Sequence, residues 1–132
     1  MELKEISPEA IMDNIFKLIG KDWMLVTAGT DVSFNTMTAA WGGLGVLWDK
    51  KICFCVIRPT RYTYTFMEKH EGFTLSFFEE QYRGALTYCG TKSGKDVDKI
   101  AQTGLTPVFD NGIIYFSEAR LVIVCRKIGS SA

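Results

Sequence analysis

The stretch from residue 52 to residue 63 reads Ile52-Cys53-Phe54-Cys55-Val56-Ile57 and then Arg58-Pro59-Thr60-Arg61-Tyr62-Thr63. Its first half is an unbroken apolar run, rich in β-branched and aromatic residues, and predicts a buried strand. From Tyr62 to His70 the pattern predicts a helix, because Tyr62 and Phe66 lie one turn apart on a shared face. The hexapeptide Arg58–Thr63 is therefore expected to form a strand-to-helix corner.

Such a corner is suited to hold an anion. The first N–H groups of a helix lack intrahelical acceptors and lie at the positive end of the helix dipole. Arg58 and Arg61 add planar, forked donors that match phosphate oxygens two at a time. The alternative is an ordinary helix start, with Thr60 as the cap and both arginines solvated at the surface. The hexapeptide alone leaves both interpretations open.

Composition limits the class of protein. The chain of 132 residues suits a single domain, 1–132, which can bury a core without disulfides or metals. Lys plus Arg and Asp plus Glu number 15 each, so no overall field favours nucleic acid or a membrane surface. The N-terminus lacks the pattern of a secretory signal, and no apolar run approaches the roughly 18 residues of a membrane span. A cytoplasmic protein is expected.

The four cysteines are Cys53, Cys55, Cys89 and Cys125. Their spacing matches neither a disulfide framework nor a zinc knuckle, so no metal site is expected. Cys53 and Cys55 lie two apart on the predicted strand and therefore share a face. We interpret them as small buried hydrophobes, with a redox or metal role as the alternative.

The rest of the chain predicts many short strands and a few helices. A helix opens at Ser7-Pro8-Glu9 and ends at Gly20, and a polar segment at 90–99 leads into a helix that ends near Gly104. A hairpin is expected at Asn111-Gly112. The expected strands are Trp23–Thr27, Asn35–Trp41, Val46–Trp48, Ile52–Ile57, Phe73–Phe78, Ile113–Phe116 and Ala119–Cys125. Without regular βαβ alternation, an antiparallel barrel or α+β domain is favoured over a doubly wound sheet.

The strand Asn35–Trp41 has an unusual composition for a core strand. Alternation sends Thr36 and Thr38 to one face, and Asn35, Met37 and Trp41 to the other. Short polar side chains leave room for something flat to lie against the backbone. A partly exposed strand with ordinary threonines is the alternative.

No nucleophile–base pair is evident, so the catalytic residues stay unknown. The single histidine, His70, lies near a helix end, where a cation suits the dipole. If the protein is an enzyme, a cofactor is expected to supply the reactivity.

Three segments together resemble one family. Asn35–Trp41, Arg58–Thr63, and Ser93–Lys99 with Gly104-Leu105 are similar to the flavin reductase-like, flavoredoxin-type family of the FMN-binding split-barrel group. The similarity runs from about Trp23 to Lys127. It implies a mainly β fold: a six-stranded antiparallel Greek-key split barrel with flanking helices, which binds FMN near the interface of a homodimer.

The resemblance also implies roles for particular residues. Thr36, Met37 and Thr38 would border the ring or ribityl part of FMN, and Asn35 and Trp41 would shape the pocket. The phosphate would be held by Arg58, Thr60, Arg61 and Thr63, with Pro59 fixing the corner. Ser93 and Lys99 would contact the flavin, with Lys95 or Lys92 as alternatives to Lys99.

The implied activity is that of an FMN-dependent oxidoreductase, with NADH or NADPH as electron donor. The alternative is an FMN-binding electron carrier, serving a redox partner protein without pyridine-nucleotide activity of its own; a barrel without cofactor is a third class. Family members generally continue beyond the position of Lys127, so the chain is either a shortened member or a truncated one.

Overall fold

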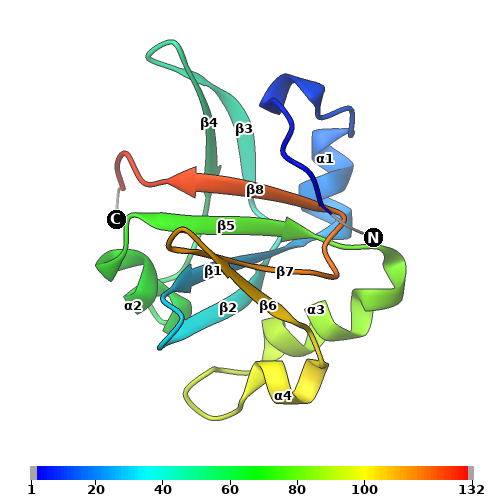
Figure 1. Ribbon diagram of the computed structural model, residues 1–132, viewed down its shortest axis with the longest axis vertical. Helices are drawn as coiled ribbons and strands as arrows, with labels where there is room; N and C mark the ends of the chain where they lie inside the picture. Colours follow the sequence, from blue (N-terminus) through cyan, green and yellow to red (C-terminus); the bar gives the residue numbers. More distant parts are fainter. Residues whose placement is uncertain (1–2, 131–132) are drawn as a thin grey trace.

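The computed structural model describes residues 3–130, which form eight strands with helices around them (Figure 1). The strands are β1 (Met24–Gly29), β2 (Phe34–Ala39), β3 (Gly42–Leu47), β4 (Lys50–Cys55), β5 (Gly72–Phe77), β6 (Pro107–Asp110), β7 (Ile113–Phe116) and β8 (Leu121–Arg126). Four of them form an antiparallel sheet in the order β2-β1-β5-β8. The other four form two antiparallel hairpins, β3–β4 and β6–β7.

Strand β1 lies inside the four-stranded sheet, and every one of its residues is buried. Its side chains alternate between two apolar clusters: Val26 packs in one, and Leu25 packs in the other with Phe78 and Phe116. Since both faces of the sheet are covered, the strand is apolar almost throughout.

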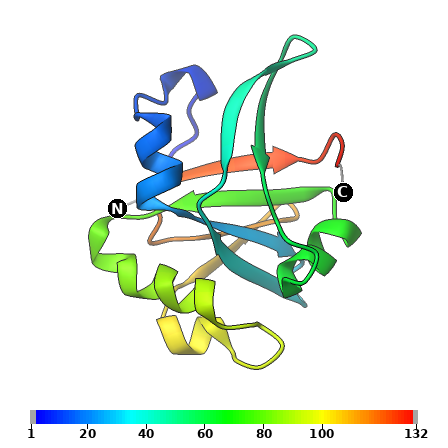
Figure 2. The same ribbon diagram turned by 180° about the vertical axis from the view of Figure 1, so that it is seen from behind.

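The longer helices are α2 (Tyr62–Lys69) and α3 (Arg83–Thr91), and the shorter ones are α1 (Ile15–Lys17) and α4 (Lys99–Thr103). A π-helical turn, η2 (Leu18–Asp22), continues α1, and short 3-10 turns lie at η1 (Pro8–Ala10) and η3 (Glu80–Tyr82). Figures 1 and 2 place α3 and α4 together at one end of the molecule, and α2 beside the end of β5 where that strand begins. No helix within residues 3–130 is long and apolar enough to cross a membrane.

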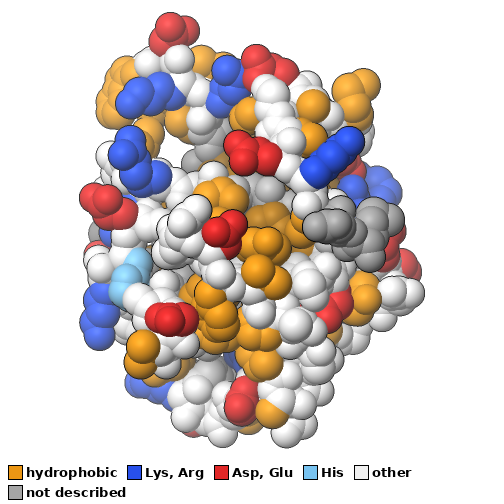
Figure 3. All heavy atoms as spheres, in the orientation of Figure 1, with side chains coloured by type: hydrophobic (Ala, Val, Ile, Leu, Met, Phe, Trp, Pro, Cys, Tyr) orange, Lys and Arg blue, Asp and Glu red, His pale blue; other side chains and the backbone are white. Residues whose placement is uncertain are grey.

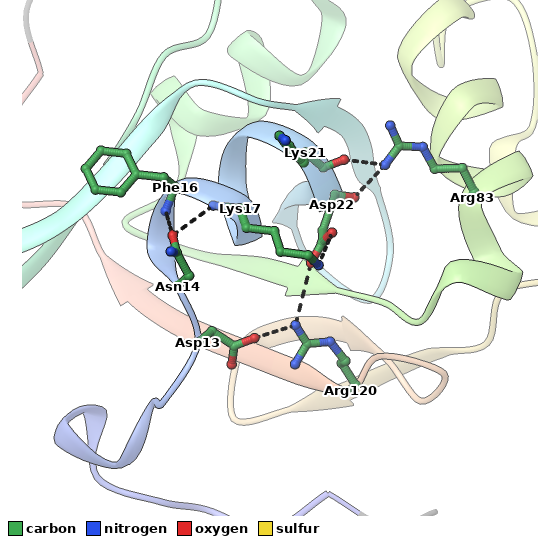
Figure 4. Close-up of polar contacts among 8 residues, drawn as sticks. All are labelled: Asp13, Asn14, Phe16, Lys17, Lys21, Asp22, Arg83 and Arg120. Atoms are coloured by element: carbon green, nitrogen blue, oxygen red, sulfur yellow. Dashed lines mark hydrogen bonds and ion pairs between the residues drawn. The ribbon is translucent and has the colours of Figure 1, made fainter.

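The single helix expected from Ser7 to Gly20 is wrong. The chain makes a 3-10 turn at Pro8–Ala10, leaves the helical conformation, and starts again at Ile15. The side chain of Asn14 causes the restart, because its Oδ1 accepts hydrogen bonds from the N–H groups of Phe16 and Lys17 (Figure 4).

Polar contacts, both within this N-terminal segment and to the rest of the molecule, hold it in place (Figure 4). Arg120 Nη2 donates to Asp13 at 2.7 Å, and Lys17 Nζ lies 2.9 Å from Asp22 Oδ1. On the other side, Arg83 of α3 donates to the carbonyl of Lys21 at 2.6 Å. The local Asn14 cap and these contacts together therefore decide the shape of a segment whose apolar spacing favours a longer helix.

The buried strand expected at Ile52–Ile57 is only partly correct. The apolar run does form β4, but the strand ends at Cys55 and, within the described residues, pairs with β3 alone. One face packs on the core through Cys53 and Cys55, and the other leaves Phe54 55% exposed. Because β4 has one neighbour and one covered face, its apolar run does not mark a central strand.

The prediction of a mainly antiparallel β fold with flanking helices is confirmed. The predicted count of six strands is wrong: residues 3–130 contain eight strands in three sheets and no closed barrel. Among the described residues, four of the eight strands form two hairpins that do not hydrogen-bond to the main sheet. A Greek-key connection stays a prediction.

Candidate functional site

A cavity of about 610 Å³ opens where β2, the start of α2, the 92–98 loop and α4 meet. It is lined by Val32, Ser33, Phe34, Asn35, Thr36, Tyr62, Phe66, Gly94, Lys95, Asp96, Val97, Asp98, Lys99, Ile100 and Pro107. The lining includes members of all three segments that carried the resemblance. The structure therefore brings these distant parts of the sequence into one place.

In the described part of the chain, the start of α2 has no side-chain cap, as an anion site at a helix N-terminus requires. Its N-cap residue is Arg61, and within residues 3–130 no side chain caps the helix. The Thr60 cap considered above is therefore wrong. Arg61 is half-buried, Arg58 and Thr60 are exposed, and Pro59 lies between them at the surface. Arg58 and Arg61 thus lie just before and at a helix N-terminus that no described side chain caps, where the first N–H groups lack intrahelical acceptors.

Arg58 is positioned by an aromatic side chain. Its guanidinium carbon lies 5.4 Å from the ring centroid of Trp41, which follows β2 and is 56% exposed. Contacts of this kind orient an arginine without using its N–H donors. Arg58 and Trp41 lie outside the cavity lining, so they extend the site along the surface.

Asn35 joins the three segments. Its Nδ2 donates to Thr63 Oγ1 at 2.7 Å, and both side chains are buried. A Cβ added to Gly94 would lie 2.0 Å from Asn35 Oδ1, so only glycine allows the loop to approach so closely. The hydroxyl of Thr63 is occupied inside the protein by this bond.

The other predicted residues of β2 serve the packing of the strand. Thr36 Oγ1 lies 2.9 Å from Thr27 Oγ1, and the Thr38 hydroxyl donates to the carbonyl of Leu86 in α3. Met37 lies in the apolar core. Only Asn35 and Thr36 of this segment line the cavity. The alternation predicted for β2 matches these contacts.

Lys99 is buried with its ammonium group directed at backbone carbonyls. Its Nζ donates to the carbonyl of Thr36 at 2.6 Å and to that of Cys89 at 3.0 Å. Burial lowers the pKa of Lys99 to about 8; the Cys89 thiol favours the charged form, and the nearby Arg61 charge disfavours it. The lysine is therefore a charge that titrates slightly above neutral pH at the edge of the cavity.

The other candidates of the late loop lie differently. Lys95 lines the cavity, with its Nζ 5.9 Å from the ring centroid of Tyr62, whereas Lys92 is absent from the lining. The Ser93 hydroxyl accepts a hydrogen bond from the N–H of Lys95 and so shapes the loop, and Ser93 is also absent from the lining.

Sequence reasoning missed the apolar walls of the cavity. Phe34, Ile100 and Pro107 line it, and Tyr62 adds an aromatic ring packed edge-on against Phe66. The sequence pattern marks Tyr62 only as a helix-face residue, although its place directly after Arg61 is a signal for the site. The described residues contain no group of three or more His, Cys, Asp or Glu side chains that could hold a metal ion.

A family profile and several solved structures match this chain. The profile of the family described as "Flavin reductase like domain" matches residues 16–132. The chain belongs to this flavin reductase-like family. Among curated protein sequences, no significant match was found.

Several solved structures share the fold. The flavoredoxin of Desulfovibrio vulgaris (Miyazaki F) is 26% identical, with a TM-score of 0.77 over 98% of this chain and 69% of that one. Flavoredoxin from Methanosarcina acetivorans is 18% identical, with a TM-score of 0.75 over 100% of this chain and 67% of that one. An FMN-binding domain of a flavin reductases-like enzyme from Shewanella baltica OS155 is 18% identical, with a TM-score of 0.75 over 88% and 62%.

Proposed function

We propose that this protein is an FMN-binding flavoprotein oxidoreductase whose flavin occupies the cavity between β2, α2 and α4. The observation that carries the proposal is the uncapped start of α2 beside that cavity, flanked by Arg58 and Arg61. Of the twelve residues for which the resemblance implies a contact, Asn35, Thr36 and Lys99 line the cavity; the others are Met37, Thr38, Trp41, Arg58, Pro59, Thr60, Arg61, Thr63 and Ser93.

The residues present fit FMN. A cavity of about 610 Å³ lies within the range typical of sites for small ligands and cofactors, roughly 300–1,000 Å³. Its walls combine apolar and aromatic side chains for a flat ring with the cationic side chains of Lys95 and Lys99, and Arg58 and Arg61 lie beside it, outside the lining. When bound, FMN would supply the electron-transfer chemistry that the side chains lack.

Each part of the chain has a distinct task in this proposal. Arg58, Arg61 and the first N–H groups of α2 bind the phosphate, and Pro59 fixes the corner. Thr63 and Asn35 hold α2 against β2, so that the phosphate site keeps its place relative to the ring. Lys99 holds positive charge near the ring and favours negative charge there.

The proposal is tested first by titrating the purified protein with FMN and with riboflavin, which lacks the phosphate. Arg58→Ala and Arg61→Ala should each weaken FMN binding about ten- to a hundredfold, because a charge-assisted contact contributes roughly 1.5–3 kcal/mol. Riboflavin affinity should stay the same in both variants.

Arg126→Ala is the matched control, since this exposed arginine lies on β8. Normal FMN affinity in both corner variants would show that the phosphate assignment is wrong. A protein that binds no flavin on titration, and has no flavin spectrum as purified, would favour the third class, a barrel without cofactor.

We further propose that NADH or NADPH supplies the electrons. The alternative, an electron carrier that receives them from a redox partner protein, is favoured by the two flavoredoxins among the structural neighbours. Anaerobic mixing of the FMN-loaded protein with NADH or NADPH separates the two. Loss of the yellow colour within catalytic times supports the enzyme, and persistent colour supports the carrier.

We also propose that the protein is cytoplasmic and forms a homodimer. Six large apolar side chains are exposed on or beside the β3–β4 hairpin: Trp41, Val46, Leu47, Trp48, Phe54 and Val56. Figure 3 shows hydrophobic side chains gathered at the tip of this hairpin, at the upper left. Contiguous exposed apolar surface is typical of interaction sites, and a second copy of the chain is the partner we propose.

A further inference from the structure

Two thiols from different sheets lie against each other. Cys53 Sγ of β4 and Cys125 Sγ of β8 are 2.9 Å apart, although they lie 72 positions apart in sequence. A disulfide bond requires about 2.05 Å, so a small movement of either side chain would bring the sulfur atoms to bonding distance. Neither residue has a part in the proposed flavin site.

The two cysteines lie between two strands that no backbone hydrogen bonds join among the described residues. Strand β8 is an edge of the four-stranded sheet, and β4 belongs to the separate β3–β4 hairpin. Figures 1 and 2 show β4 crossing β8 and β5. Within residues 3–130 no ladder joins β4 to β8, so side chains make the connection. Cys53 and Cys125 pack there against the same apolar cluster.

The two thiols are chemically unequal. The hydrogen bond between them lowers the pKa of Cys53 and raises that of Cys125, and burial raises that of Cys125 further. Burial also raises the pKa of Cys55 to about 11. Since the thiolate is the nucleophile, one sulfur of this close pair can attack an oxidant and the other can resolve the product, and the lowered pKa favours Cys53 for the attack. Both are half-buried, so a small oxidant can reach them.

We propose that Cys53 and Cys125 form a reversible dithiol–disulfide site that reacts with peroxides and joins the β3–β4 hairpin covalently to β8. The Cys53 thiolate attacks one oxygen of hydrogen peroxide, the O–O bond breaks, and the departing oxygen leaves as water after taking up a proton. Cys53 is then a sulfenic acid.

In the second step the Cys125 sulfur attacks Cys53 Sγ, the S–O bond breaks, and the hydroxyl leaves as a second water with the Cys125 proton. Two thiols and one peroxide thus become one disulfide and two waters: each sulfur loses one electron, and the peroxide gains two. A dithiol reductant reverses the change by thiol–disulfide exchange.

The test uses the reduced full-length protein, treated with hydrogen peroxide and then alkylated after denaturation. Two of the four thiols should escape alkylation, and mass spectrometry should find the peptide of Cys53 joined to that of Cys125, with the loss of two hydrogen atoms. Because Cys55 shares a peptide with Cys53, the same mapping is done on Cys55→Ser, which should give the same link.

Cys89→Ser is the matched control, since Cys89 is buried in the other apolar cluster and should not affect the reaction. Cys53→Ala and Cys125→Ala should each abolish the link, with circular dichroism as the check on folding. The oxidised wild type should also melt roughly 5–15 °C higher than the reduced form, because the bond closes a long loop.

Four thiols that remain free in excess peroxide would overturn the proposal. So would a link that needs Cys55 or Cys89. Both outcomes are read from the wild type and the serine variants, so they do not depend on whether the alanine variants fold.

Discussion

Lys99 is the residue at which stability and the proposed function oppose each other. Burial lowers its pKa from the ordinary 10.5 to about 8. Between these values the unfolded chain keeps the proton and the folded chain has lost it, so the free energy of unfolding rises with pH from about 8 to 10.5. Below pH 8 the folded protein holds a buried charge and is less stable. A group kept at such a disadvantage is a candidate for a functional charge.

The pH dependence of FMN affinity tests this role. The negative charge of bound FMN favours the protonated form of Lys99. FMN should therefore bind most tightly near pH 7.5, and its affinity should fall towards pH 9.5 by up to about tenfold per pH unit. Lys99→Met should weaken binding at pH 7.5 and remove the slope. Fluorescence titrations at several pH values measure both. A slope that persists in Lys99→Met would assign the titration to another group.

The same variant should also alter the stability curve of the protein without ligand. In urea titrations, the rise in the free energy of unfolding between pH 8 and 10.5 should be smaller in Lys99→Met than in the wild type, because the residue that releases the proton is gone. Lys95→Met is the control, since no comparable backbone contacts of its Nζ exist among the described hydrogen bonds. Equal slopes in all three proteins would contradict the assigned pKa.

At the scale of elements, the loop before α4 depends on a single close approach. A methyl group at Gly94 would lie 2.0 Å from Asn35 Oδ1, and Asn35 in turn binds Thr63 of α2. Gly94→Ala should therefore displace the loop or break the Asn35–Thr63 bond. We expect a loss of about 1–3 kcal/mol in stability and at least tenfold weaker FMN binding.

Gly84→Ala provides the matched control with the opposite sign. Gly84 lies in α3, and nothing is within 4 Å of a Cβ placed there. Alanine should stabilise this helix by about 0.5–1 kcal/mol and leave FMN affinity unchanged. Urea denaturation and FMN titration of both variants give the comparison. Equal effects at the two glycines would show that the Gly94 contact is unimportant.

Local signals in the sequence were sufficient for several elements. The Asn111-Gly112 turn predicted the β6–β7 hairpin, and both residues have positive φ angles in the structure. The helix expected from Tyr62 to His70 forms as α2, with His70 as its C-cap. These features depend on turn chemistry and helical spacing, which neighbouring residues determine almost alone.

Features that depend on distant partners could not be predicted in this way. The apolar pattern of Ile52–Ile57 does not reveal whether a strand has one neighbour or two, and here it has one. The contact between Cys53 and Cys125 likewise joins strands far apart in sequence. In the site, the charged corner was visible as a motif, whereas Phe34 and Ile100 are ordinary apolar residues until the fold places them at the cavity.

At the scale of the whole molecule, the exposed apolar hairpin predicts self-association. Phe54→Glu and Trp48→Glu place charges on residues that are 55% and 74% exposed. If β3–β4 is the interface, both variants should be monomers at concentrations where the wild type is a dimer, with unchanged circular dichroism.

Sedimentation velocity at several concentrations measures the change. Met12→Glu is the comparison, because Met12 is 90% exposed and lies outside the hairpin, on the N-terminal segment whose Glu9 pairs with Lys51 of β4. A wild type that sediments as a monomer at all concentrations would exclude the homodimer. Dissociation by Met12→Glu alone would place the interface at the N-terminal segment instead.

The order β2-β1-β5-β8 also determines when the protein can fold during translation. Strand β5 needs β1, made about 50 residues earlier, and β8, which is complete only at Arg126. A nascent chain halted after β7 would carry β5, with Phe73, Leu75 and Phe77, as a sheet edge that lacks its β8 neighbour. Such an edge can pair with another chain, so a chain that ends shortly before residue 121 should be prone to aggregation.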